Sequence, residues 1–331
     1  MKAPKSVVTG GCGFIGSHMV DLLLAEGHEV VVIDNLSTGR LANLEHHKGA
    51  PELKVVQADV TDGQRMAAEF AGAEWVFHFA ALGDIVPSIE RPTAYVGTNV
   101  MGTLGVLEGA RAAGVKRFVY SASSSCYGIA DIYPTPETAP IRTEYPYALS
   151  KYLGEQLVLH WGRVYGIPVV SLRYFNAYGP RSRTSGAYGA VFGVFLAQKL
   201  HGHPFTVVGD GTQSRDFVFV TDVARANLMA ARSSVRGEVF NVGAGKPQTV
   251  NRLVELLGAP GVVHVPRRPG EPDRTEADIG KIRAMLGWEP AVSFERGVEL
   301  IVENIDYWRQ APLWTVEKIE AATREWFKRL G

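Results

Sequence analysis

Tyr147 and Lys151, four residues apart, form the pair in this chain that is best suited to acid–base chemistry. They lie in PYALSKYLGEQLVLHWG, whose apolar spacing is helical, so both side chains project from one helix face. An ammonium group beside a phenol favours the ionised phenol and lowers its pKa. The resulting phenolate is a competent general base toward a hydroxyl group. Because this spacing also arises by chance on exposed helices, its surroundings must decide between the two interpretations.

A glycine-rich turn near the N-terminus supplies a second chemical feature. Gly10, Gly13 and Gly16 are spaced GxxGxxG and open a helical pattern. Such glycines permit close backbone approach, and the N–H groups at the helix N-terminus favour a pyrophosphate. Asp34 ends the next run, EVVVID, where an acid accepts hydrogen bonds from the adenosine ribose and repels a 2′-phosphate. The pattern therefore predicts NAD rather than NADP, and we interpret Arg40 as a solvated loop charge.

The elements that must position these groups alternate along the first half of the chain. Short β-branched or aromatic runs, SVVTG, EVVVID, LKVVQAD, WVFHFAA and KRFVYSAS, are separated by helix-length segments. This alternation predicts an α/β fold, a Rossmann-type doubly wound parallel sheet. Later Gly/Pro loops predict a smaller C-terminal α/β substrate lobe. We assign residues 1–175 to an NAD-binding domain that includes the Tyr147–Lys151 helix. Residues 176–331 form mainly the substrate lobe, with some segments returning to the sheet.

Composition excludes several classes of partner and site. Lys plus Arg and Asp plus Glu both number 34, so no overall charge attracts nucleic acid or an anionic membrane. Two cysteines, Cys12 and Cys126, argue against a disulfide framework, and no apolar stretch approaches the roughly 20 residues of a membrane span. We expect a cytoplasmic protein. We also expect no metal site, because the adjacent His46 and His47 should diverge and lack a supporting carboxylate or cysteine spacing.

A series of motifs resembles a known family over nearly the whole chain. GGCGFIGS, HFAA, SSSCYG, YALSK, RYFNAYGPR, RDFVFVTDV and RPGE occur in the order found in extended short-chain dehydrogenase/reductases that act on nucleotide sugars, especially UDP-glucose 4-epimerase-like enzymes. The resemblance implies NAD as cofactor and Ser123, Tyr147 and Lys151 as catalytic residues. In this scheme Tyr147 is the base, and Lys151 binds the nicotinamide ribose and tunes the tyrosine.

The resemblance also implies two sets of binding residues. The cofactor set is Gly10, Gly13, Phe14, Ile15, Gly16, Asp34, Asn35, Ser37, Gly39, Asp59, Val60, Phe79, Ala80, Ala81, Asn99, Ser121, Tyr147, Lys151 and Tyr174. The substrate set is Ser123, Ser124, Asn176, Val191, Thr206, Val208, Gln213, Arg215, Arg268 and Glu271. Guanidinium groups suit diphosphate oxygens, and the family often has a carboxylate for the nucleotide ribose at the RPGE position.

The reaction expected from the resemblance is epimerisation of a UDP-hexose, or another nucleotide sugar, at C4. Related 4,6-dehydratases carry Thr-Asp-Glu where this chain has Ser123-Ser124-Ser125, and serine cannot do the acid–base work of elimination. Oxidation at C4, rotation of the 4-keto sugar and hydride return would regenerate NAD in each turnover. A nucleotide-sugar dehydrogenase that releases NADH uses the same residues and remains an alternative, as does a dehydratase.

Two further expectations concern substrate size and assembly. The segment ALGDIVPSIERP differs from the sequence usually found in epimerases after the HFAA motif. Gly83 and Asp84 should therefore give the sugar pocket a different shape. Thr275 stands where some relatives carry a bulky tyrosine, which leaves room for a 2-acetamido sugar. Relatives commonly dimerise through two helices per subunit, which predicts a homodimer through helices over 96–113 and 147–164.

Overall fold

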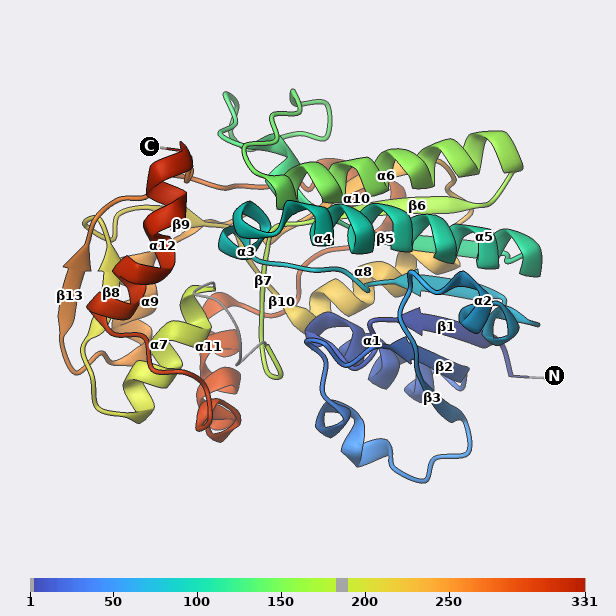
Figure 1. Cartoon of the computed structure of the whole chain (residues 1–331), viewed down its shortest axis with the longest axis horizontal. Coiled ribbons are helices and arrows are strands. Elements are labelled where there is room, and N and C mark those ends of the chain that lie inside the picture. The colour runs from blue at the N-terminus through green and yellow to red at the C-terminus, as the bar shows by residue number, and fades with distance from the viewer. Residues whose placement is uncertain (1–2, 183–189, 331) are drawn as a thin grey trace.

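The β-branched and aromatic runs of the first half become neighbouring strands of one parallel sheet in the computed structural model, which describes residues 3–182 and 190–330 (Figure 1). Seven of the described strands form this sheet, in the order β11-β6-β5-β4-β1-β2-β3. They are β1 (Lys5–Thr9), β2 (Glu29–Asp34), β3 (Leu53–Gln57), β4 (Trp75–His78), β5 (Arg117–Ser123), β6 (Val169–Tyr174) and β11 (Glu238–Val242). The predicted doubly wound α/β fold is confirmed.

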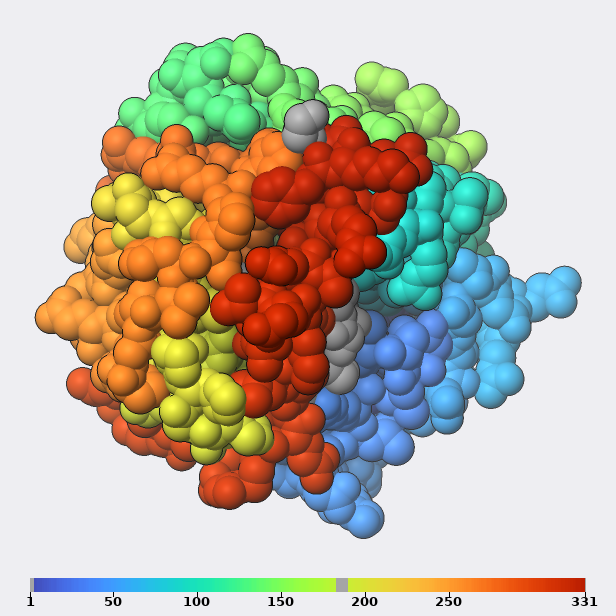
Figure 2. Space-filling model, turned by 60° about the vertical axis from the view of Figure 1, so that its left-hand side comes forward, coloured from blue at the N-terminus to red at the C-terminus, as the bar shows by residue number. Residues whose placement is uncertain are grey.

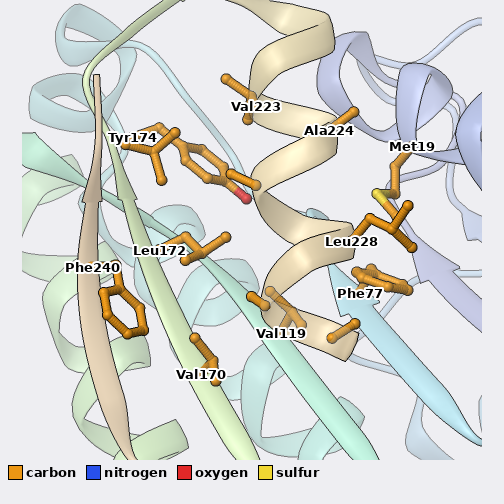
Figure 3. Close-up of a cluster of buried hydrophobic side chains, with 14 of the residues drawn as sticks. Met19, Phe77, Val119, Val170, Leu172, Tyr174, Val223, Ala224, Leu228 and Phe240 are labelled. Carbon is orange, nitrogen blue, oxygen red and sulfur yellow. The ribbon is translucent and has the colours of Figure 1, made fainter. Parts of the chain in front are cut away.

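Helices cover both faces of the sheet, which explains why its central strands are apolar on both sides. Helices α1 (Phe14–Ala25) and α8 (Val220–Arg232) lie on one face, and α5 (Thr103–Ala113) and α6 (Pro146–Tyr165) on the other (Figure 1). Figure 3 shows Leu228 of α8 and Met19 of α1 packed over Phe77 of β4. The sheet is therefore a rigid, buried platform for the loops at its edge.

Parts of the chain after residue 176 return to this platform. Strand β11 pairs with β6, and α8 packs beside α1. The remaining strands form short pairs in the lobe: β7 (Asn176–Tyr178) with β10 (Phe217–Phe219), β8 (Phe205–Val208) with β13 (Val262–Val265), and β9 (Ser214–Arg215) with β12 (Gln248–Thr249). The lobe helices are α7 (Val191–Leu200), α9 (Val250–Leu257), α11 (Phe294–Glu303), η5 (Ile305–Trp308) and α12 (Val316–Leu330). Helix α10 (Gly280–Leu286) packs on β11.

One expected helix is interrupted. In place of a continuous helix over 96–113, α4 (Pro92–Val96) passes through a π-helical segment, η3 (Gly97–Gly102), into α5. The interruption contains Asn99, whose side-chain amide donates to Leu82 O at 3.0 Å and to Ser150 Oγ at 2.9 Å. Single π-helical turns often occur at functional sites. Here the turn fixes the segment after β4 against α6.

The remaining short elements connect these parts. They are η1 (Leu41–His47), α2 (Gly63–Ala67), η2 (Ala68–Phe70), α3 (Ile85–Glu90) and η4 (Ser124–Tyr127). Helix α12 contacts α3, so the C-terminal helix joins the lobe to the large domain, and Figure 2 shows it crossing the surface between the two. Among the described helices, none has both the length and the apolar character needed to cross a bilayer.

Candidate cofactor and substrate site

The strand order reverses between β1 and β4, which is where open α/β sheets bind their ligands. Gly10 follows β1 with φ +71°, and a Cβ there would lie 2.7 Å from the backbone N of Ala80 after β4. A Cβ on Gly16 would lie 2.1 Å from Gly10 O. Both glycines are therefore required by close backbone contact, as the motif predicts.

A cavity of about 260 Å³ opens at this point of the sheet. Thirteen predicted cofactor residues line it: Gly10, Gly13, Phe14, Ile15, Gly16, Asp34, Asn35, Ser37, Val60, Phe79, Ala80, Ala81 and Ser121. The wall also contains residues outside the predicted cofactor set, namely Ile33, Thr38, Ala58, Leu82, Gly83 and Thr98. Of these, Gly83 was expected in the sugar pocket. Each directly adjoins a predicted residue or continues a run of them, so extending each motif by one or two positions would have found them.

The polar groups around this cavity fit a dinucleotide. Helix α1 begins after Gly13, and no described side chain caps its first N–H groups, which leaves them for an anion. Asp34 is buried at the end of β2, where its Oδ2 accepts from Cys12 N at 3.0 Å and its Oδ1 accepts from Leu36 N at 2.8 Å. Burial raises the pKa of Asp34, and the two backbone donors oppose that rise. The carboxylate is thus held in a fixed orientation at the cavity wall.

Several other predicted cofactor residues support the wall but are not among those lining the cavity. A Cβ on Gly39 would lie 2.9 Å from Asp34 Oδ2, so this glycine lets its loop close over the acid. Asp59 accepts from Asn35 Nδ2 at 2.7 Å. Tyr174 is buried beside α8 (Figure 3). Its hydroxyl donates to Asn227 Oδ1 in α8 at 2.8 Å. Together with Asn99, these side chains hold neighbouring residues in place.

Tyr147 and Lys151 lie in α6, as predicted, and Ser123 ends β5 beside them. The phenol of Tyr147 hydrogen-bonds the Ser123 side chain. Ser123 Oγ lies 2.8 Å from Ser125 Oγ and accepts from Ser125 N at 3.2 Å. Lys151 is 4% exposed, and its Nζ lies 4.6 Å from the centre of the Tyr120 ring. The structure therefore brings the predicted acid–base groups together.

The expected effect of Lys151 on the Tyr147 pKa is wrong for this structure. Burial raises the pKa of Tyr147, and the hydrogen bond with Ser123 only partly offsets that rise. The Lys151 ammonium faces the Tyr120 ring, so the shared helix face does not translate into a lowered phenol pKa. Burial lowers the pKa of Lys151 itself to about 7, against the opposing charge of Glu155.

Behind these groups lies a buried ion pair that the sequence reasoning missed. Glu155, one turn after Lys151, is 1% exposed and accepts from Arg173 Nε at 3.0 Å and Nη2 at 2.5 Å. Arg173 Nη1 donates to Tyr127 Oη at 2.8 Å, and Tyr127 belongs to the serine-rich turn. The available signal was the continuation of the i,i+4 series from Tyr147 through Lys151. This pair ties α6 to the turn that carries the serines.

On the lobe side, the structure brings together the two arginines and the acid of the predicted substrate set. Arg215 Nη2 lies 2.9 Å from Glu271 Oε1, and Arg268 Nη1 lies 3.6 Å from Glu271 Oε2. Glu271 Oε2 is buried and accepts no hydrogen bond from the residues that the structure describes. Buried carboxylate oxygens are normally satisfied, so this atom is suited to receive a ligand hydroxyl.

The other predicted substrate residues have differing environments. Asn176 Oδ1 accepts from Thr275 Oγ1 at 3.0 Å. Thr275 therefore lies beside the side-chain amide of Asn176, a predicted substrate-binding group. Thr206 is buried and its hydroxyl accepts from Gln198 Nε2 at 2.9 Å. This hydroxyl is therefore used in a hydrogen bond inside the lobe. Gln213 donates to Val208 O at 2.8 Å. Val191 begins α7, and Ser124 begins the turn after β5.

The C-terminal helix α12 lies against this site. Trp326 of α12 is 3% exposed, and its Nε1 donates to Pro269 O at 2.8 Å. The guanidinium carbon of Arg268 lies 5.5 Å from the centre of a Trp326 ring, within the range of a cation–π contact. Helix α12 therefore supports the RPGE loop that carries Arg268 and Glu271.

Two expectations about surface residues are overturned. Arg40 is half-buried, with its guanidinium carbon 5.5 Å from the centre of the Tyr307 ring, so it is not a solvated loop charge. The side chains of His46 and His47 do not diverge, because both imidazoles reach one carboxylate, that of Asp21. Neither contact joins residues close in sequence, so local spacing gave no signal for them.

Comparisons with known proteins agree with this geometry. The NAD dependent epimerase/dehydratase family matches residues 6–243. UDP-glucose 4-epimerase of Mycolicibacterium smegmatis is 36% identical over 307 residues, covering 90% of this chain and 97% of the relative. The structure of UDP-glucose 4-epimerase from Thermotoga maritima with UDP-glucose is 37% identical, with a TM-score of 0.85 over 92% of this chain and 99% of that one. The structure of UDP-N-acetylglucosamine 4-epimerase from Methanobrevibacter ruminantium is 33% identical, with a TM-score of 0.87 over the same shares.

Other matches are named as dehydratases or decarboxylases of nucleotide sugars, so overall similarity identifies the family but not the individual reaction. The family match spans both the glycine turn and the Tyr147–Lys151 helix, and the relatives cover most of the chain. This chain therefore belongs to the NAD-dependent epimerase/dehydratase family and is an NAD-dependent nucleotide-sugar enzyme of the extended short-chain dehydrogenase/reductase type.

Proposed function

We propose that the enzyme epimerises a UDP-hexose at C4 through a transient 4-keto sugar. The observation that carries this proposal is the set of groups around Tyr147: its phenol bonds Ser123, and the next two residues are serines. Elimination of water from a sugar needs groups that protonate a departing hydroxyl and remove a carbon-bound proton. Ser124 and Ser125 cannot supply them near neutral pH. Proton exchange at one hydroxyl is the chemistry that this site supports best.

In the proposed mechanism, Tyr147 would remove the proton of the C4 hydroxyl as hydride leaves C4, and would return the proton as hydride adds to the opposite face of the turned 4-keto sugar. Ser123 holds the phenol oxygen and the sugar hydroxyl in line. Bound NAD supplies the acceptor and then the donor of the hydride. Residues that line the cavity from Gly10 to Gly16 and at Asp34 would hold its pyrophosphate and adenosine ribose. The Arg215–Glu271–Arg268 group would hold the diphosphate and the ribose of the nucleotide. These contacts would leave the hexose itself free to turn about its link to the diphosphate.

The reaction is tested by incubating the purified enzyme with UDP-glucose, UDP-galactose, UDP-GlcNAc and UDP-glucuronate, with and without added NAD. Proton NMR identifies the products, and absorbance of the reduced nicotinamide is recorded in parallel. We expect a C4 epimer without accumulating absorbance. NADH formed in proportion to sugar consumed would identify a dehydrogenase, and a 4-keto-6-deoxy product would identify a dehydratase; either result contradicts the proposal.

One observation favours an enlarged hexose as a second candidate substrate. Thr275 bonds Asn176 and also accepts from Asp216 N at 3.0 Å, so a small, anchored side chain occupies this part of the proposed pocket. A 2-acetamido group would find space there. The same assay decides the matter, because epimerisation of UDP-GlcNAc is expected and complete inactivity toward it, with activity on UDP-glucose, contradicts this extension.

We predict that Arg215→Gln raises KM for the nucleotide sugar by about 10- to 100-fold, because a charged hydrogen bond contributes roughly 1.5–3 kcal/mol. The proton-transfer groups remain, so kcat should change much less. Steady-state kinetics measure both constants. Arg267→Gln is the matched control, since Arg267 is exposed and pairs with Asp210 and Asp273 on the surface. Equal KM values in the two variants would remove Arg215 from the proposed diphosphate site.

We also propose a homodimer through the predicted stretch 96–113, which is formed by the end of α4, η3 and α5, and through α6, which packs beside it. Large apolar side chains remain exposed on these elements: Val96 at 41%, Met101 at 54%, Leu149 at 43% and Leu153 at 38%. Burying them in a second copy would remove this apolar surface from water.

Met101→Glu combined with Leu153→Glu should therefore convert a dimer into a monomer, because it would bury like charges in the interface. Light scattering at micromolar concentration measures the mass. Val262→Glu, at another exposed apolar position, serves as the control and should leave the mass unchanged. A wild-type monomer under these conditions would refute the dimer.

A further inference from the structure

Two adjacent histidines at the end of η1 converge on one carboxylate of α1. Nε2 of His46 lies 2.8 Å and Nε2 of His47 lies 2.9 Å from Oδ1 of Asp21. One potential ligand atom from each of the three residues lies within 4.8 Å of the others. The two imidazole rings are 4.2 Å apart between centres and tilted by 44°. These potential ligand atoms come from two elements, α1 and η1, and all three lie close together.

We propose that Asp21, His46 and His47 bind one divalent transition-metal ion, with zinc as the best-suited ion. Two imidazole nitrogens and one carboxylate oxygen are a typical zinc ligand set, with water able to take the fourth position. Metal–ligand distances of about 2.0–2.2 Å place neighbouring ligand atoms of a tetrahedral site roughly 3.4 Å apart. The observed separations of 2.8 and 2.9 Å are shorter, so modest side-chain rotation would open the site.

The Asp21 carboxylate is already held in position by its surroundings. Arg181 Nη2 donates to Oδ2 at 2.5 Å, which leaves Oδ1 facing the imidazoles. The nearby guanidinium charge opposes a second cation, so we expect affinity in the micromolar range and not the much tighter binding of an all-protein zinc site.

Metal binding would join α1 to η1 below the glycine turn. Asn43 of η1 donates through Nδ2 to Cys12 O at 2.8 Å, and Arg181 Nη1 donates to Asn43 O at 3.0 Å. An ion at Asp21 would therefore add a cross-link to the segment that supports the dinucleotide loop. Because binding to the folded state alone stabilises it, zinc should raise Tm. The proposed epimerisation does not need this ion.

The test is titration of the metal-free, full-length protein with ZnCl₂ by isothermal calorimetry, accompanied by thermal unfolding with and without zinc. We expect one ion per chain and a higher Tm. His46→Gln combined with His47→Gln should weaken binding by at least about tenfold and abolish the Tm increase. His203→Gln, at an exposed histidine elsewhere, is the matched control and should bind like the wild type.

Cobalt(II) provides a readout that reports the ligands directly, because its visible spectrum differs between tetrahedral and octahedral coordination. We expect the wild type, but not the double-histidine variant, to give the tetrahedral spectrum. The double-histidine variant is preferred over Asp21→Asn, which also removes the Arg181 ion pair. Absence of zinc binding by the wild type, or equal zinc affinity in the wild type and the double variant, would overturn the proposal.

Discussion

Replacement of Tyr147 by phenylalanine is expected to lower kcat by about 10²–10⁴-fold, the usual contribution of a positioned general acid–base group. The ring remains in place in α6, where it lies 6.4 Å from the parallel ring of Tyr145, so packing should be preserved. Only the hydroxyl that bonds Ser123 is lost. Turnover of the nucleotide sugar is measured by NMR, and bound NAD is measured after denaturation of the purified variant.

Tyr152→Phe is the matched control, since Tyr152 lies in the same helix and packs against the core. It should retain wild-type kcat and NAD content. Ser123→Ala should fall between the two, because it removes the partner of the phenol but not the phenol itself. If Tyr147→Phe kept more than a tenth of wild-type kcat, Tyr147 would not be the proton-transfer group. A tenfold loss corresponds to only about 1.4 kcal/mol of activation free energy.

The second large effect is expected on stability, from Glu155→Gln. Glu155 and Arg173 are both almost completely buried, and Ser171 Oγ also donates to Glu155, at 3.0 Å. Removing one member of a buried ion pair leaves the other charge without compensation and costs about 3–5 kcal/mol. Urea unfolding should show this loss as a lower midpoint with an unchanged slope. Glu325→Gln, at an exposed ion pair of α12, should have little effect, and equal midpoints for the two variants would contradict the prediction.

The same substitution should change the pH dependence of activity. Burial lowers the pKa of Lys151 to about 7, and the carboxylate of Glu155 opposes this fall. Without that carboxylate the pKa of Lys151 falls further, so the ammonium form is retained only at lower pH. Because the Lys151 ammonium is proposed to bind the nicotinamide ribose, kcat of folded Glu155→Gln, relative to wild type, should be reduced more at pH 8 than at pH 6. A loss independent of pH would assign Glu155 a structural role without influence on Lys151.

The spacing of residues along the chain was sufficient to predict a site wherever one short segment contains all of its chemical groups. Gly10 and Gly16 are dictated by backbone contacts within and beside one turn, and Asp34 closes the next strand, so most of the predicted cofactor residues line one cavity. The i,i+4 rule likewise placed Tyr147 and Lys151 in α6. Alternation of apolar runs and helices was enough for the parallel sheet, because strands buried on both faces are apolar throughout.

The sequence by itself thus determined the dinucleotide turn and the helix that carries the acid–base pair, since each depends on residues within about 30 positions of one another. It also determined the parallel sheet, because strand and helix patterns alternate repeatedly along the chain. Only the tertiary structure decided the pKa of Tyr147, the buried Glu155–Arg173 pair and the meeting of Asp21 with His46 and His47. These depend on burial and on side chains from separate elements. Desolvation and through-space contact are properties of the packed chain, and neither is encoded in the spacing of any one motif.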